Sequence, residues 1–262
     1  MVDTMRAERF YADSKTIVVE DIPIPHPGPG EVLVKVAFCG ICHSDLSLIN
    51  GTFPPQRPVV TQGHEASGTI ARLGAGVTGW AEGDRVVVAA GRPCTTCPNC
   101  RRGDMTNCLR VQLMAFAYDG AWAEYTVAQA VGLTRVPDNV LLEQAAILAD
   151  AVSTPFDAVG LKSTFEQGLD CVTVGGRLVS VGMSAESPSV GPTSMFGLAQ
   201  KYVLGHLGYQ NVDIETLATL LSRGRLDLSR SISDIVSLED VSVGIEKLER
   251  QEGNPIRILV KP

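Results

Sequence analysis

The feature that most constrains this chain is a group of four cysteines within fifteen residues. They follow the spacing C-x2-C-x2-C-x7-C, at Cys94, Cys97, Cys100 and Cys108. Because turn-forming and small polar residues separate them, one loop can wrap four thiolates around a tetrahedral ion, as in closed structural zinc sites. An iron–sulfur cluster, disulfides and unligated thiols are the alternatives, since ferredoxin-type clusters have related spacings. We predict a structural zinc lobe, in which Arg101 and Arg102 offset part of the thiolate charge.

The composition disfavours several classes of protein. Of 262 residues, 45% are hydrophobic and 19% are charged, which is ordinary for a globular chain. The net charge of −7 disfavours nucleic acid or an anionic membrane as a partner. No run approaches the ~18 apolar residues of a transmembrane span, and the first eight residues lack the apolar core of a secretory signal. Nothing in the cysteine pattern points to an oxidising compartment, so we expect a cytoplasmic protein.

The first hundred residues predict short strands joined by turns. Runs rich in β-formers occupy residues 16–20 and 31–38, with a Pro/Gly loop between them. The pattern continues at residues 68–73 and 85–89. Short, closely spaced strands of this kind are typical of a β-barrel or sandwich.

The second half of the chain has a mixed helical and strand pattern. Residues 141–159 are Ala-rich and predict a helix that Pro155 should break or restart, and a further helix is expected at residues 163–172. The apolar runs 177–181 and 202–207 lack strict alternation, which is typical of parallel strands covered on both faces. Two helices and a strand should complete the chain, at residues 213–223, 241–250 and 256–260.

A second set of metal-binding residue types is scattered along the chain. Cys42 lies in G-I-C-H-S-D directly after a strand, His64 and Glu65 lie in G-H-E, and Asp150 lies in I-L-A-D-A. Taken alone, a cysteine at a strand end is more often a small buried hydrophobe than a ligand, and a single G-H-E carries little information. The combination of these residues with the four-cysteine segment makes them candidates.

The motifs together resemble one family. From Glu31 to Asp150, the segments G-I-C-H-S-D, G-H-E-x2-G, G-D-R-V and the four-cysteine lobe resemble the GroES-like catalytic domain of zinc-dependent medium-chain alcohol dehydrogenases. The part from G-G-R-L-V-S-V-G onward is also similar to this family. The resemblance implies a mixed α/β fold, with a GroES-like β-barrel catalytic domain in residues 1–150 and 211–262. Residues 151–210 would be a truncated remnant of a doubly wound Rossmann sheet.

The resemblance also implies a catalytic zinc ion. Carried over to this chain, its ligands would be Cys42, His64 and Asp150, because aspartate is a variant of the third ligand in such enzymes. Glu65 would be a nearby, exchangeable ligand. One thiolate, one imidazole and one carboxylate leave a fourth position open for substrate, which agrees with the chemistry of catalytic zinc sites. The cofactors would therefore include two Zn2+ ions per chain.

Further roles follow from the same resemblance. Ser44 would pass the proton of the substrate hydroxyl outward, Asp45 would orient His64, and His43 would face the cofactor pyrophosphate. Serine occupies position 47, where relatives often place a relay histidine. The remaining histidines and cysteines are assigned no chemistry: we expect His26 at the surface, and His206, Cys39 and Cys171 in packing roles.

The segment that should bind the nicotinamide is missing from its expected place. After T-P-F-D-A-V the family has a strand, a Gly-rich phosphate turn and a helix, but here the chain passes to what resembles a later helix and strand of that sheet. Relative to the family, the chain skips about 80–100 residues, the span of two to three β-α units. Gly182 would border the nicotinamide, and NAD or NADP would bind if the missing segment is present. A true deletion, a segment absent from this sequence and a half supplied by another chain all remain open.

These observations favour an alcohol or aldehyde oxidoreductase that acts on a small-molecule substrate. One alternative is a cofactor-independent zinc lyase, hydratase or hydrolase. A non-catalytic zinc-binding homologue is the other. Two isolated parallel strands would leave apolar faces and an edge uncovered, so we also expect a homodimer or tetramer in which residues 202–207 pair across a two-fold axis.

Overall fold

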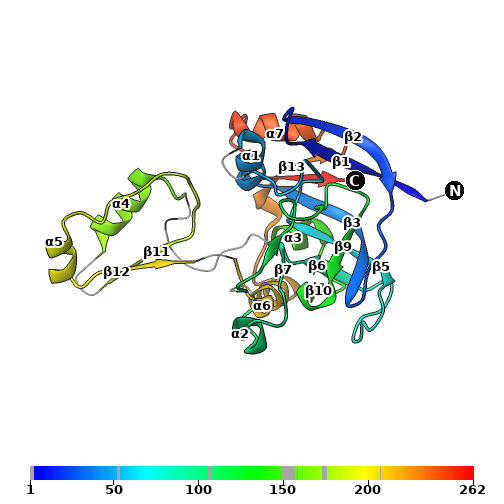
Figure 1. Cartoon of the computed structure of the whole chain (residues 1–262), viewed down its shortest axis with the longest axis horizontal. Helices are drawn as coiled ribbons and strands as arrows, with labels where there is room; N and C mark the ends of the chain where they lie inside the picture. Colours follow the sequence, from blue (N-terminus) through cyan, green and yellow to red (C-terminus); the bar gives the residue numbers. More distant parts are fainter. Residues whose placement is uncertain are drawn as a thin grey trace. The chain divides into compact units, whose positions relative to one another are not determined.

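The computed structural model describes residues 3–51, 54–105, 108–148, 157, 159–172, 176–206 and 208–262, with only the backbone described at His43. The chain divides into two compact units (Figure 1). Unit 1 comprises Met1–Ala151 and Gln210–Pro262, and unit 2 comprises Val152–Tyr209. Within the described residues, no helix has the length and apolar character needed to cross a membrane.

A seven-stranded sheet forms the centre of unit 1. Its strands, in spatial order, are β10 (Leu133–Arg135), β6 (Arg85–Val88), β5 (Ala66–Leu73), β3 (Glu31–Ile41), β14 (Arg257–Lys261) and β13 (Ile232–Ser237), with β9 (Tyr125–Gln129) also paired to β3. Strand β3 bonds β5 along one edge, and β9 followed by β14 along the other. Its valines at positions 32, 34 and 36 are buried in the main core. A strand with three partners curves the sheet, as the barrel prediction requires.

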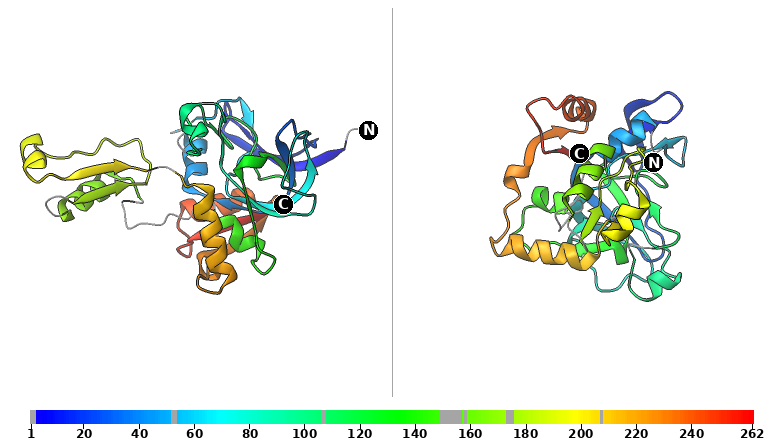
Figure 2. Two further views of the ribbon diagram at one scale, coloured as in Figure 1. Left: turned by 90° about the horizontal axis from the view of Figure 1, so that it is seen from below. Right: turned by 90° about the vertical axis from the view of Figure 1, so that its left-hand side faces the viewer.

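Smaller elements complete unit 1. A second sheet has the order β2 (Thr16–Pro23), β1 (Thr4–Tyr11) and β4 (Val59–Val60). The hairpin of β7 (Gly91–Arg92) and β8 (Gln112–Leu113) brackets the four-cysteine segment, which contains α2 (Pro98–Arg101). The remaining helices are α1 (His43–Asn50), α3 (Leu142–Ile147), α6 (Asn211–Ser222) and α7 (Val241–Glu249). In the two views of Figure 2, α6 lies beside β10, which it contacts.

The spacing of buried residues explains why the C-terminal helix packs where it does. In α7 the buried positions are Val241, Gly244, Ile245 and Leu248, which share one face of a helix. This face packs on β13 and β14. At Gly244 an added Cβ would lie 2.8 Å from Ile41 Cδ1, so a larger residue there would displace the Ile41 side chain.

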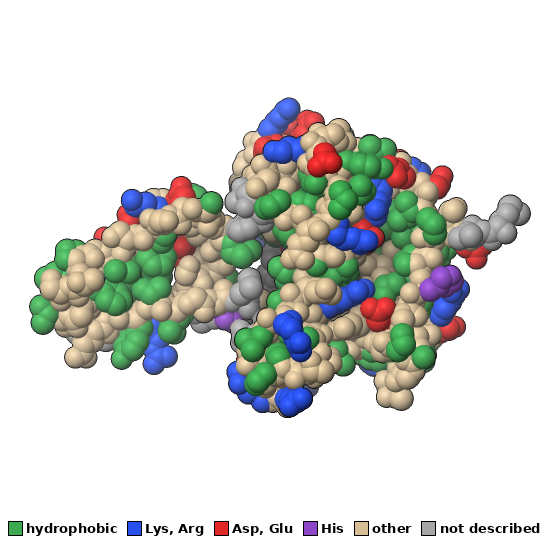
Figure 3. All heavy atoms as spheres, viewed as in Figure 1, with side chains coloured by type: hydrophobic (Ala, Val, Ile, Leu, Met, Phe, Trp, Pro, Cys, Tyr) green, Lys and Arg blue, Asp and Glu red, His purple; other side chains and the backbone are tan. Residues whose placement is uncertain are grey.

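Unit 2 contains a two-stranded parallel sheet. Strand β11 (Arg177–Ser180) pairs with β12 (Tyr202–Gly205), with Leu178 opposite Val203, and this confirms the predicted parallel pair. Helix α4 (Lys162–Cys171) packs Phe165 and Leu169 against Leu178. A short helix, α5 (Thr193–Leu198), lies between the strands in sequence. The space-filling view shows apolar side chains gathered on this unit (Figure 3). Its exposed apolar residues include Met195, Leu198, Tyr202 and Leu204.

Two sequence-based expectations are corrected by this unit. Cys171 is exposed rather than packed, and His206 is exposed rather than in a core. Cys171 is the last residue of α4 and His206 follows β12, so both lie at the ends of their elements, beyond the buried cluster of Phe165, Leu169 and Leu178. Of the Ala-rich run 141–159, the structure describes a helix at Leu142–Ile147, and residues 149–156 lie outside the described residues.

Candidate metal centres

The four predicted cysteine ligands converge in space. Their sulfur atoms all lie within 4.8 Å of one another. The Sγ atoms of Cys97 and Cys100 are 3.5 Å apart, and those of Cys94 and Cys100 are 4.0 Å apart. These separations are longer than a disulfide bond of about 2.05 Å, and they suit four thiolates around one ion.

Hydrogen-bond donors point at these sulfurs from the surrounding backbone. The amide of Cys94 donates to Cys108 Sγ at 3.1 Å, and the amide of Cys97 donates to Cys94 Sγ at 3.3 Å. Backbone bonding from Thr96, helped by the Arg110 guanidinium, lowers the pKa of Cys94 to about 5. Donors of this kind stabilise thiolates, which are the form that binds zinc.

The cation at this cluster is not one of those expected from the sequence. Arg102 forms an ion pair with Asp104 at 3.3 Å. Arg110 instead donates from Nη2 to Cys94 Sγ at 3.5 Å. Arg110 follows the last cysteine by two residues, and this short distance in sequence was the only indication that it could contact the cluster.

The second candidate cluster brings together Cys42, His64 and Glu65, whose ligand atoms all lie within 4.8 Å of one another. Strand pairing explains this, because Cys39 at the end of β3 is opposite Ala66 at the start of β5. The backbone continues the pairing where the amide of Gly40 donates to Glu65 O at 2.9 Å. A Cβ at Gly40 would lie 2.1 Å from Glu65 Oε2, so this strand end requires glycine.

The imidazole of His64 is held from both sides. Its Nδ1 lies 3.3 Å from Oδ1 of Asp45, which is fully buried, and its Nε2 lies 3.0 Å from Ser44 Oγ. The other oxygen of Asp45 accepts the amide of Cys42 at 2.9 Å. Burial opposes the charged ring, but Asp45 and Cys42 outweigh it and raise the pKa of His64 well above its ordinary value. A carboxylate on Nδ1 leaves Nε2 available to a metal.

Glu65 is paired with a residue that the sequence reasoning missed. Its side chain is 1% exposed, and Oε1 lies 3.2 Å from Arg257 Nη1. Arg257 belongs to β14, 192 residues further along the chain. The guanidinium is a close positive partner for this buried carboxyl group, whose oxygen atoms could bind a metal ion. A charged residue at the start of an apolar strand was the only sequence signal.

Comparison with known families decides the relationship. Residues 28–138 match the family described as alcohol dehydrogenase GroES-like domain, and residues 116–223 match the zinc-binding dehydrogenase family. This chain belongs to the zinc-type medium-chain alcohol dehydrogenase family. The resemblance inferred from the motifs is thereby confirmed.

Curated relatives in this family are longer. An alcohol dehydrogenase from Rhizobium meliloti (strain 1021) is 37% identical over 175 residues, which are 66% of this chain and 51% of the relative. One from Schizosaccharomyces pombe is 35% identical over 151 residues, which are 57% of this chain and 43% of the relative. The chain spans about half the length of the curated relatives it matches.

Solved structures of alcohol dehydrogenases and reductases share the fold. Alcohol dehydrogenase TADH from Thermus sp. ATN1 superposes with a TM-score of 0.85 at 23% identity, covering 98% of this chain and 99% of its own. Acetophenone reductase from Geotrichum candidum NBRC 4597, solved in complex with NAD, gives a TM-score of 0.84 at 22% identity, covering 100% and 98%. These likenesses support the mixed α/β fold of a medium-chain dehydrogenase.

Two further residues expected from the family cannot be compared with the structure. The third predicted zinc ligand, Asp150, lies outside the described residues, and so does the side chain of His43. Of the expected cofactor contacts, Gly182 is described. Its amide donates to Asp157 O at 2.9 Å, just after β11.

The start of α4, which resembles a later helix of the family's sheet, does not replace the missing phosphate turn. The Asp157 carboxylate accepts the amide of Gly160 at 3.0 Å and the hydroxyl of Thr164 at 2.8 Å. The amide of Lys162 donates to Glu186 Oε2 at 2.5 Å. A helix start that is satisfied by the chain's own carboxylates repels a pyrophosphate rather than binding it.

A G-x-G-x-x-G pattern does occur at residues 74–79, but its setting is wrong for a dinucleotide. It lies in the turn between β5 and β6, which are antiparallel strands. The described residues between this pattern and β6 form no helix, whereas the dinucleotide fingerprint must open a helix.

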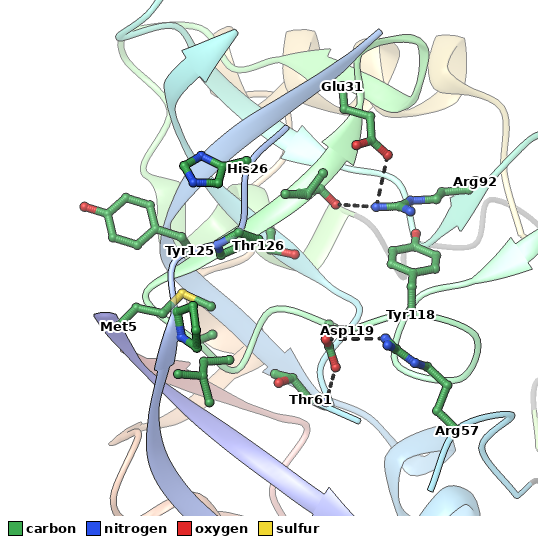
Figure 4. Close-up of a pocket in the computed structure, with 16 residues that line it drawn as sticks. Met5, His26, Glu31, Arg57, Thr61, Arg92, Tyr118, Asp119, Tyr125 and Thr126 are labelled. Carbon is green, nitrogen blue, oxygen red and sulfur yellow. Dashed lines mark hydrogen bonds and ion pairs between the residues drawn. The ribbon is translucent and has the colours of Figure 1, made fainter. Parts of the chain in front are cut away.

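Unit 1 also contains a cavity of about 290 Å³, lined by β-strand and loop residues (Figure 4). Its charges are paired with one another: Arg92 lies 3.3 Å from Glu31 and Arg57 lies 3.5 Å from Asp119. The Arg92 guanidinium also stacks over the ring of Tyr118 at 4.0 Å. None of the candidate metal ligands that the structure describes lines this cavity, and we assign it no role in catalysis.

Proposed function

We propose that this chain is a zinc-dependent alcohol or aldehyde oxidoreductase with two zinc ions. One would be structural, held by Cys94, Cys97, Cys100 and Cys108. The other would be catalytic, held by Cys42, His64 and Asp150, with Glu65 as an exchangeable ligand. The observation that carries the proposal is the convergence of Cys42, His64 and Glu65 within 4.8 Å, with Asp45 behind His64.

The donor set suits this assignment. A thiolate, an imidazole and a carboxylate are common zinc ligands, and a three-residue set leaves one position for a substrate. Zinc at such a site lowers the pKa of a bound alcohol or water and polarises a carbonyl. Asp45 keeps the proton of His64 on Nδ1, and Arg257 keeps Glu65 oriented toward the cluster.

Ser44 is the residue proposed to move the proton. Its hydroxyl lies 3.0 Å from His64 Nε2, so it lies beside the atom that would bind the metal. A hydroxyl both accepts and donates, and Ser44 is only half-buried, so it can take a proton from a substrate hydroxyl and release it toward water.

The start of α4 does not fit the pyrophosphate of a nicotinamide cofactor, because carboxylates of the chain itself accept the amides there. We therefore derive no hydride step from these residues. The same observation favours a second candidate function, a cofactor-independent zinc lyase, hydratase or hydrolase acting through a polarised carbonyl or water.

Titration of the zinc-loaded protein with NADH and NADPH, followed by nicotinamide fluorescence, separates the two functions. An oxidoreductase should bind one of them and interconvert alcohols and aldehydes. Turnover of a carbonyl substrate with no nicotinamide binding would support the second function instead. If His64→Ala kept both nicotinamide binding and turnover, the two proposed functions would both be refuted.

The organisation of the chain fits this assignment. We assign residues 1–150 and 211–262 to the GroES-like zinc domain and residues 151–210 to the Rossmann remnant. A cytoplasmic setting would keep the seven cysteines reduced. We further propose a homodimer through β12, whose apolar residues Tyr202 and Leu204 are exposed in the single chain.

A further inference from the structure

Glu8 is a fully buried carboxyl group with no cation beside it. It lies in β1 and is 0% exposed. Its neighbour Arg9 projects from the other face of the strand, where it pairs with Asp119 at 2.8 Å. Among the described residues, Glu8 forms no ion pair. A buried carboxylate without a partner is costly, so this group needs another explanation.

The carboxyl group closes a ring of three hydrogen bonds. The amide of Glu8 donates to Trp122 O at 2.8 Å, and the amide of Trp122 donates to Gln62 O at 3.0 Å. The amide of Gln62 then donates to Glu8 Oε2 at 2.7 Å. Glu8 contributes the only side chain to this ring, and its bond fixes the Gln62 backbone.

Gln62 connects this ring to the candidate catalytic site. It lies two residues before His64, and its side-chain Nε2 donates to Asp45 O at 3.4 Å. Gly63, between them, has a φ of +85° and packs so closely on Trp122 that a Cβ would lie 2.3 Å from its ring. Gln62 therefore belongs to the backbone that leads into His64 and also bonds Asp45, the residue behind the His64 ring.

We propose that Glu8 is a positioning residue: its buried carboxyl group fixes the amide of Gln62 and thereby holds His64 and Asp45 in register for the metal. The inference rests on the proposed zinc site at Cys42 and His64.

Glu8 acts as a neutral acid. Burial raises the pKa of Glu8 well above its ordinary value of 4.5, and the nearby charges of Asp45 and Asp119 act in the same direction. The Gln62 amide and Arg9 oppose them. Two buried acceptors, Glu8 Oε1 and Gln62 Oε1, have no hydrogen-bond partner. A proton on Glu8 removes the buried negative charge, which costs more to bury than a neutral carboxyl group.

Zinc affinity of three variants tests the positioning role. Glu8→Met keeps the volume of the side chain but removes the acceptor for Gln62. Glu8→Gln keeps that acceptor and mimics the neutral acid. Glu124→Met is the matched control, because Glu124 also accepts one strand amide, that of Arg6 at 2.8 Å, and its hydrogen bonds within the described chain are to Arg6 and Val36. The zinc content of each protein is measured by native mass spectrometry against increasing chelator.

Wild type, Glu8→Gln and Glu124→Met should hold two zinc ions with equal affinity. Glu8→Met should keep the four-cysteine zinc and bind the second about tenfold more weakly, the lower end of the effect of outer-shell partners. Equal affinity in Glu8→Met and wild type, with two zinc ions in each, would overturn the positioning role alone. A wild type that binds only the four-cysteine zinc would overturn the proposed function and this inference together.

The pH dependence of Tm tests the neutral state, which a purely steric role would not affect. Above about pH 4.5 the unfolded chain releases the Glu8 proton while the folded chain retains it, so rising pH lowers the stability of wild type. Glu8→Gln has no proton to release at this position and does not lose this stability. The Tm of Glu8→Gln minus the Tm of wild type should therefore increase as pH rises from about 5 to 8. A Tm difference between the two proteins that stays constant over this range would show that Glu8 is already ionised in the folded chain, and would refute the neutral acid.

Discussion

Replacing Arg257 by methionine should destabilise the protein far more than removing an exposed ion pair does. Arg257→Met leaves Glu65, which is 1% exposed, without the guanidinium that lies 3.2 Å from it. Removing one partner of a buried pair typically costs about 3–5 kcal/mol, because a desolvated charge remains. The Arg257 side chain is 16% exposed and some water can reach the site, so we expect about 3 kcal/mol.

The neighbouring pair of Lys247 and Asp234 provides the matched control. These charges lie 2.6 Å apart, but their side chains are 35% and 39% exposed. Lys247→Met should therefore cost at most about 1 kcal/mol. Both substitutions put the same residue into the packed C-terminal segment of β13, α7 and β14.

Urea unfolding of the zinc-loaded proteins, followed by circular dichroism, measures both free energies of unfolding. Adding Glu65→Gln to Arg257→Met should recover part of the lost free energy of unfolding, since position 65 then carries a neutral side chain. If Arg257→Met cost no more than Lys247→Met, the Glu65 carboxylate would not depend on Arg257, and the reasoning would be wrong.

Three other substitutions test separate parts of the account. Ser44→Ala should leave both zinc ions bound and slow turnover by about 10²–10⁴-fold, and unchanged steady-state kinetics would remove Ser44 from the mechanism. Cys97→Ser should lower yield and thermal stability with loss of one zinc ion by metal analysis, while the zinc at His64 stays; retention of both ions would contradict a closed four-thiolate site. Val203→Asp, in the middle of β12, should give a monomer that aggregates, and sedimentation of wild type as a stable monomer at micromolar concentration would exclude the dimer.

Local patterns in the sequence were sufficient for most of the elements. The strand at β3 and the helices α4, α6 and α7 were predicted to within a few residues, because their apolar spacing and flanking glycines are clear. Strand β1 was missed, since Arg6, Glu8 and Arg9 interrupt its apolar pattern. The structure shows that Glu8 is buried and Arg9 is paired, so charged residues occupy covered positions in this strand.

The candidate site could be predicted only in part. The four cysteines are close in sequence, and their spacing alone indicated a shared ion. The proximity of Cys42 and His64 depends on the register of β3 and β5, which no local pattern encodes, and it came from the family resemblance. The pairing of Glu65 with Arg257 spans 192 residues, and neither the motifs nor the spacing could have indicated it.

X-ray absorption at the zinc edge tests the central claim most directly. Wild-type protein should contain two zinc ions per chain, with an average shell of sulfur at about 2.3 Å and nitrogen or oxygen at about 2.0–2.1 Å. In His64→Ala the zinc content should fall to one, and the remaining shell should consist of sulfur alone. One zinc ion in well-folded wild type, or an unchanged mixed shell in His64→Ala, would contradict a catalytic zinc at Cys42 and His64.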